Sequence, residues 1–119
     1  MKTEDLELKG LGQFIGTEHY YKVFGVYVTD GVKYIMENGY RWLVTDAIAV
    51  IKYQKQVKKY LEKDRFLSIK LHLLEDYKAR VTFENNDKII YTQNYDFTDA
   101  KREITLFYVD NVLMLNSEY

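Results

Sequence analysis

Basic side chains recur at helical spacing in the middle of the chain and could bind an anionic surface of a macromolecule. On one continuous helix of about 3.6 residues per turn, they fall within about 80° of one another. The stripe consists of Arg41, Lys52, Lys55, Lys59 and Lys63. It could follow a phosphate backbone or dock on an acidic protein surface, and Lys rather than Arg favours attraction by charge without bidentate readout. The alternative is a hydrated helix face with no partner.

Carboxylates and a histidine form a second group that could bind Mg²⁺ or act as acid and base. The group consists of Glu18, His19, Asp30, Asp46 and Glu118. Thr17–Glu18 and Thr29–Asp30 also mark expected helix starts, where side-chain oxygens accept hydrogen bonds from free backbone N–H groups. Capping therefore explains these two pairs without catalysis. Asp46 falls on the apolar side of its helix, so we expect it to be buried and hydrogen-bonded to a tyrosine or to Trp42.

Tyrosine is frequent, with 12 Tyr in the chain. Its large ring and polar tip make it common in binding surfaces, although it also fills half-buried positions beside a sheet. Tyr53 and Tyr60, next to the basic stripe, are the candidate anchors for a partner. A different hypothesis places a small ligand, such as a nucleotide, in a pocket near the first predicted caps. Its lining would be Thr17, Glu18, Tyr21, Thr29, Asp30 and Trp42.

The first half of the chain is expected to be mainly helical, which would position these side chains. Caps and apolar spacing predict a short helix over about residues 4–9, a short helix or turn over 18–24, and a short strand over 25–28. A further helix begins at Thr29 or Asp30 and ends at Asn38–Gly39. The longest helix is predicted over about residues 40–63. Its apolar stripe comprises Leu43, Ala47, Val50, Val57 and Leu61, opposite the basic one.

After residue 64 the apolar period changes to two, which is typical of strands. Alternation predicts strands over residues 67–73, 79–84, 88–93, 104–109 and 112–115. Asn85–Asp87 and Asp110–Asn111 are the expected hairpin turns, because Asn and Asp tolerate positive φ. The predicted fold is α+β: N-terminal helices, including one long amphipathic helix, packed on an antiparallel β-meander of about four to five strands.

Composition limits the classes of function. With 119 residues, 47% hydrophobic and 29% charged, the chain is expected to form a single domain over residues 1–119. The absence of Cys excludes disulfides, zinc-thiolate sites and thiol nucleophiles, and the net charge of −1 gives no global attraction to nucleic acid or membrane. No signal-peptide pattern or apolar run long enough for a membrane span is present, so we expect a cytoplasmic protein. No phosphate-loop or metalloprotease motif occurs, and no cofactor or metal is expected.

Several short strings, in this order, resemble a family of small bacterial, plasmid and phage proteins known only as a domain of unknown function. They are Phe14–Glu18, Tyr20–Tyr21, Thr29–Tyr34, Trp42–Leu43, Asp96–Phe97 and Leu113–Tyr119. The chain departs from the family pattern at Thr98 and Asn116, where Pro is usual, and at the Asp110–Asn111 turn, where Asp-Gly is frequent. The resemblance implies a fold and a mobile-element context, and no catalytic residue.

Three hypotheses of function follow. The first is a non-catalytic interaction protein of a phage or other mobile element, acting as monomer or homodimer. It would bind and inhibit a protein or ribonucleoprotein of a bacterial host, and an RNA-guided defence nuclease of the CRISPR type is the most specific expectation. Any contact with RNA would use the basic stripe. The second hypothesis is the small-ligand binder described above. The third is a metal-dependent phosphoesterase using Glu18, His19 and Asp30.

Overall fold

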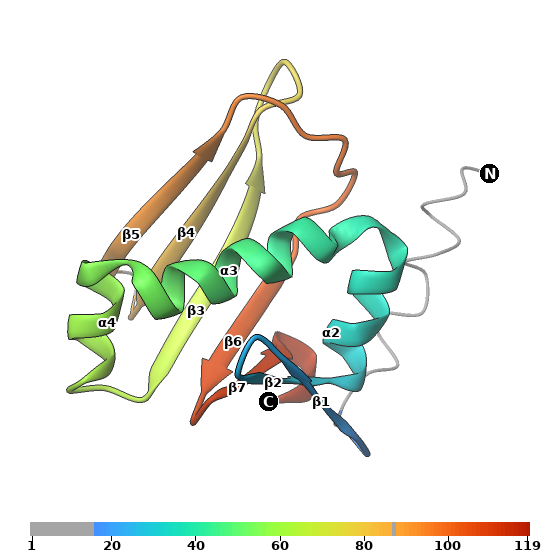
Figure 1. The fold of residues 1–119 in the computed structure, drawn as a ribbon. Coiled ribbons are helices and arrows are strands. Elements are labelled where there is room, and N and C mark those ends of the chain that lie inside the picture. The colour runs from blue at the N-terminus through green and yellow to red at the C-terminus, as the bar shows by residue number, and fades with distance from the viewer. Residues whose placement is uncertain (1–15, 87) are drawn as a thin grey trace.

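In the computed structural model, which describes residues 16–86 and 88–119, helices cover one face of a mixed sheet (Figure 1). The strands are β1 (Tyr20–Val23), β2 (Val26–Thr29), β3 (Phe66–Leu73), β4 (Ala79–Asn85), β5 (Lys88–Tyr95), β6 (Thr105–Val109) and β7 (Val112–Leu115). Their order across the sheet is β1-β2-β7-β6-β3-β4-β5. The α+β class is therefore confirmed. The helix expected over residues 4–9 lies outside the described residues.

The start of the described chain is a hairpin. Of the two structures expected over residues 18–24, a short helix or a turn, the helix is therefore wrong. β1 pairs antiparallel with β2, and Val23 lies opposite Val26. The two residues between them, Phe24 and Gly25, have φ values of 47° and 83°. Positive φ at both positions is the type I′ geometry that matches the twist of the strands. The strand expected over 25–28 is confirmed within one residue as β2.

The expected helix after Thr29 is confirmed as α2 (Asp30–Ile35), followed by a wider helical turn, η2 (Met36–Tyr40). The Thr29 hydroxyl accepts a hydrogen bond from Val32 N at 3.4 Å and so caps the first turn. The expected stop is also present, because Asn38 and Gly39 leave helical geometry and Gly39 has φ of 99°. Glycine adopts this conformation without the clash that a Cβ would cause.

The single long helix expected over residues 40–63 is wrong. It is divided into α3 (Arg41–Tyr53) and α4 (Lys55–Leu61), because Gln54 has extended geometry with ψ of 123°. α4 therefore turns away from the axis of α3 (Figure 1). The break lets each segment bury its own apolar side chains, with Ile51 of α3 5% exposed and Val57 of α4 fully buried.

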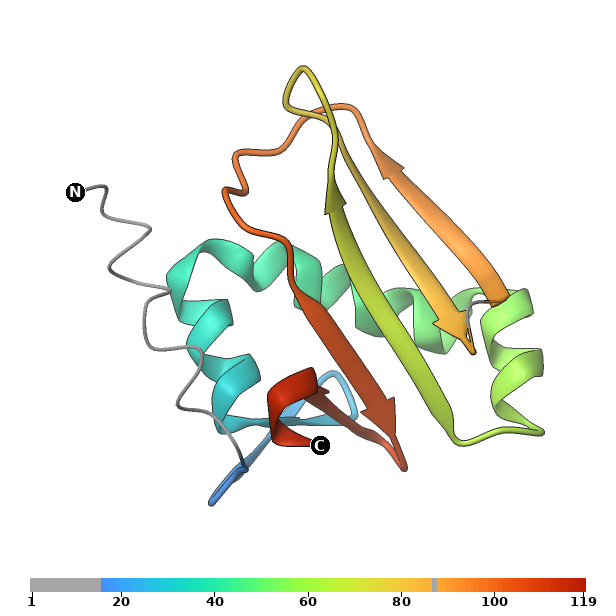
Figure 2. The ribbon, with the colours of Figure 1, turned by 180° about the vertical axis from the view of Figure 1, so that it is seen from behind.

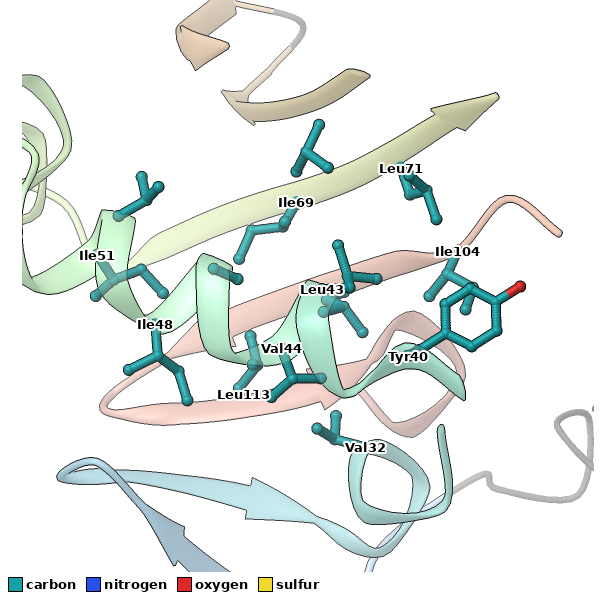
Figure 3. Packing of buried hydrophobic residues seen from close by; sticks show 14 of the residues in the cluster. Val32, Tyr40, Leu43, Val44, Ile48, Ile51, Ile69, Leu71, Ile104 and Leu113 are labelled. Atoms are coloured by element: carbon teal, nitrogen blue, oxygen red, sulfur yellow. The ribbon is translucent and has the colours of Figure 1, made fainter. Parts of the chain in front are cut away.

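The core lies between α3 and the central strands (Figure 3). Leu43 and Ile48 of α3 pack with Ile69 and Leu71 of β3, and each of these side chains is at most 2% exposed. The apolar face expected for this helix is therefore confirmed for its first part. Burial of this continuous apolar surface is the main force that holds the helical layer on the sheet.

The sheet is larger than the expected meander of four to five antiparallel strands. β3, β4 and β5 follow one another, but β6 returns to pair with β3 on its other side, and β7 pairs parallel with β2. The return uses the segment 96–104, where Thr98 N donates to Tyr77 O at 2.7 Å. Figure 2 shows the opposite face of the sheet, where no described helix lies over β3 or β4. None of the helices in the described part of the chain is both long and apolar enough to cross a membrane.

Candidate interaction surface

The basic residues do not form one straight stripe, because the break at Gln54 redirects the second half of the predicted helix. Arg41 and Lys52 lie on α3, Lys55 and Lys59 on α4, and Lys63 in the turn that follows it. Arg41 and Lys52 are eleven residues apart on one helix, which is about 16 Å along its axis. Arg41 is therefore remote from the other four.

The other four basic residues, Lys52, Lys55, Lys59 and Lys63, follow one another from the end of α3 through α4 into the turn after it, and we call them the lysine corner. The last three are exposed, and Lys52 extends over Gly25 of the β1–β2 turn. Within residues 16–86 and 88–119, the ion pairs join His19 to Asp30, Arg65 to Asp110 and Lys70 to Glu84. None of these involves the lysine corner, so its ammonium groups have no carboxylate partner among the described residues.

An apolar hollow of about 220 Å³ adjoins the lysine corner, between the β1–β2 turn and α3. Its lining is Phe24, Thr45, Ile48, Ala49, Lys52 and Tyr53. The rings of Phe24 and Tyr53 stand at its rim and are 71% and 78% exposed. We call this feature the Phe24 hollow. It joins exposed aromatic area, which is enriched in protein-binding surfaces, to positive charge that can attract the acidic groups of a partner.

Tyr60, the second predicted anchor, is not part of this surface. Its hydroxyl donates to Phe66 O at 2.6 Å and ties α4 to the start of β3. Burial and the neighbouring Asp64 raise the pKa of Tyr60 to about 12. The second exposed ring beside Tyr53 is instead that of Phe24. The sequence carried a signal for it, since an aromatic residue stands where a two-residue hairpin turn before Gly favours Asn or Asp.

The predicted ligand pocket is a hydrogen-bonded cap at the start of α2. Asp30 Oδ2 accepts from Glu18 N at 2.9 Å and His19 N at 3.3 Å, and Asp30 Oδ1 accepts from the Tyr21 hydroxyl at 3.0 Å. Thr17 Oγ1 in turn accepts from Asp30 N at 2.9 Å. The N–H donor of Glu18, followed by the Tyr21 hydroxyl, lowers the pKa of Asp30. The carboxylate is thus engaged on both oxygens.

The end of the chain completes this cap from the other side. Glu118 Oε1 accepts from the Thr29 hydroxyl at 2.6 Å and from Leu115 N at 2.9 Å, while Oε2 accepts from Gly31 N at 3.0 Å. The strings around Thr17, Thr29 and Glu118, far apart in sequence, therefore meet at the first turn of α2. Their polar groups bond to one another. The expected cap at Thr29 is confirmed, whereas Thr17 and Glu18 do not begin a helix of their own, because β1 follows them.

Trp42, the remaining residue of the predicted ligand pocket, is placed elsewhere. Its ring packs edge-on against Tyr95 with centroids 5.1 Å apart. Asp46, one helical turn later, accepts a hydrogen bond from the Tyr95 hydroxyl at 2.8 Å. The expected bond from Asp46 to a tyrosine is present, although this carboxylate is half-buried. Among the described residues, no three His, Cys, Asp or Glu side chains are grouped to hold a metal ion.

Together the fold and the surface define a small α+β protein with a capped first helix and an exposed aromatic and basic corner. Residues 5–119 match DUF6876, described as a family of unknown function, and the chain belongs to this family. The expected membership of a domain family of unknown function is thus confirmed. No curated protein and no solved structure matches the chain.

Proposed function

We propose that this protein is a non-catalytic interaction protein that binds an acidic surface of a protein partner through the Phe24 hollow and the lysine corner. The observation that carries this proposal is Phe24 itself. It is a large apolar side chain, 71% exposed, on a backbone with φ of 47°. Left-handed geometry costs an ordinary L-residue about 1 kcal/mol or more, and exposure gives no compensating burial. Binding to a partner would provide that burial.

The chemistry of the surface determines the kind of partner that fits. The hollow beside α3 accepts an apolar side chain, and the rings of Phe24 and Tyr53 supply contact area around it. Lys52, Lys55 and Lys59 would attract carboxylates next to that apolar anchor and speed association. A phosphate backbone would satisfy the lysines but would leave the apolar hollow unused. An acidic protein surface with an apolar anchor uses both.

The test combines capture of a partner with a variant that should not harm the fold. Immobilised wild-type protein and the F24N variant are exposed to lysate of the source cells, and retained proteins are identified by mass spectrometry. Asn is favoured in this turn, so the variant keeps the hairpin. We expect the partner to be lost with F24N and with the triple variant K52E/K55E/K59E. The control is I89T, which changes another exposed apolar side chain, 55% exposed on β5.

Retention of the same partner by all three variants would overturn the proposal. If treatment with ribonuclease removes what the immobilised protein captures, the surface binds RNA rather than a protein partner. That the partner is a host macromolecule of a mobile element, and an RNA-guided nuclease in particular, stays a prediction from the family resemblance. The small-ligand and phosphoesterase hypotheses receive no such support, because the polar groups they need are engaged in the cap of α2.

A further inference from the structure

A second hollow, of about 260 Å³, lies at the other end of α3, where the helix meets the end of β5 and the segment that follows it. Its lining is Trp42, Asp46, Tyr95, Phe97, Thr98 and Asp99. Three of these residues are aromatic and two are carboxylates. The volume is slightly below the range of pockets for drug-sized ligands, which begins at about 300 Å³. The hollow therefore suits a small chemical group rather than a large molecule.

The aromatic walls are held in place by contacts within the protein. Tyr95 packs edge-on against Trp42, with 68° between the ring planes, and its hydroxyl is fixed by Asp46 Oδ2 at 2.8 Å. Phe97 is different, because its ring is 71% exposed and contacts Tyr77 at a centroid distance of 6.2 Å. Two walls are thus ordered by the fold, and the third stands free at the opening.

The charge in this hollow is negative and unpaired among the described residues. No basic group of residues 16–86 or 88–119 lies within ion-pairing distance of Asp46 or Asp99. The only hydrogen bond to Asp46 in that part of the chain, from Tyr95, engages one of its oxygens. At the edge of the same patch, Lys101 Nζ lies 5.9 Å from the Tyr77 ring centroid, so a cation of the chain itself already contacts the aromatic patch.

We propose that this hollow binds an organic cation, namely a substituted ammonium or a guanidinium group. The faces of aromatic rings attract cations, and Trp is the strongest of the three ring types. The nearby carboxylates add charge attraction, which a neutral apolar ligand would not use. A small metal ion fits less well, because hard cations need six or more oxygen ligands and half of this lining is aromatic. The site shares no lining residue with the Phe24 hollow and is independent of the function proposed above.

Trp42 makes the proposal directly measurable, because it is the one tryptophan of the chain. Its emission is followed while choline chloride is added to the full-length protein. Matched titrations use sodium chloride at equal ionic strength and 3,3-dimethylbutanol, the neutral counterpart of choline. We expect a saturable change with choline and none with the two controls. The same response with dimethylbutanol, or no saturation with choline, would overturn the proposal.

Variants then locate the site. D46N removes the charge but keeps an oxygen that can accept from Tyr95, and it should raise the Kd for choline about fivefold. F97A removes the exposed wall and should weaken binding to a similar extent without unfolding, as checked by circular dichroism. E75Q, the same loss of charge on the exposed β3–β4 turn, and F24N should bind as the wild type does. Unchanged affinity in both D46N and F97A would contradict the assignment.

The source of the cation is distinguished by a second ligand. Short peptides with one trimethyllysine or one arginine are titrated in the same way. Tighter binding of a peptide than of choline assigns the site to a side chain of a protein partner. Tighter binding of choline assigns it to a free quaternary ammonium compound. Both outcomes support an organic-cation site.

Discussion

Glu118 accepts a hydrogen bond from the hydroxyl of Thr29 at 2.6 Å, although 89 residues separate the two. This contact fastens the last turn of the chain, η3 (Asn116–Glu118), to the first turn of α2. The same carboxylate accepts from Gly31 N and Leu115 N. Since β7 pairs parallel with β2 just before this point, Glu118 closes the junction between the two ends of the described chain.

Removal of this carboxylate should weaken the whole fold. E118A leaves three donors without their acceptor, and hydrogen bonds to charged groups each contribute about 1.5–3 kcal/mol when desolvated. Because this cluster is only partly buried, we expect a loss of about 2 kcal/mol in the free energy of unfolding, measured by urea denaturation. E75A, on an exposed turn, is the control and should change it by less than about 0.5 kcal/mol. Equal stability of the two variants would show that the junction is not stabilising.

Gly31 should resist replacement even though it lies in a helix. Ala normally stabilises a helix interior relative to Gly by about 1 kcal/mol. Here a Cβ would lie 2.5 Å from Leu115 Cδ1 and 2.6 Å from Glu118 Oε1, so both neighbours would have to move. We therefore expect G31A to lower the melting temperature. G16A is the control, because no atom of the described residues lies within 4 Å of its added Cβ, and it should be close to neutral. A rise in melting temperature with G31A would refute the close approach.

The free energy of unfolding at alkaline pH should depend on Tyr60. Burial first, and then Asp64, raises the pKa of Tyr60 from 10.0 to about 12. The folded state therefore holds this proton after the unfolded state has lost it. The stabilisation is complete below pH 10 and is lost as the pH rises from 10 to 12. In Y60F, the slope of unfolding free energy against pH in this window should become less steep. An unchanged slope would exclude a contribution from Tyr60.

The sequence pattern predicted those parts of the fold that depend on local chemistry. The Thr29 cap, the stop at Gly39 and the buried face of α3 follow from side-chain oxygens, from glycine and from apolar spacing. The break at Gln54 could not be predicted in this way, because no Gly or Pro marks it. It arises from tertiary packing, which draws Val57 into the core and Tyr60 to β3.

For the candidate sites, too, the sequence predicted residues that are close in the chain and missed contacts between distant elements. Lys52 and Tyr53 do share one surface, since both line the Phe24 hollow. The meeting of Phe24 with α3, and of Trp42 with Tyr95, joins elements that are far apart in the chain, and no local period encodes such contacts. The strand order has the same cause, because β6 pairs with β3 although β4 and β5 lie between the two in the chain.

The Phe24 turn should reveal a conflict between stability and binding. Asn is favoured over Phe at a left-handed position before Gly in a type I′ turn. F24N should therefore raise the free energy of unfolding by up to about 1 kcal/mol, measured by urea denaturation. The control is F24A, which removes the ring but not the unfavourable φ of 47°, and it should not raise stability. If F24N instead destabilises the protein, the ring serves the fold, and the argument that Phe24 is kept for a partner is lost.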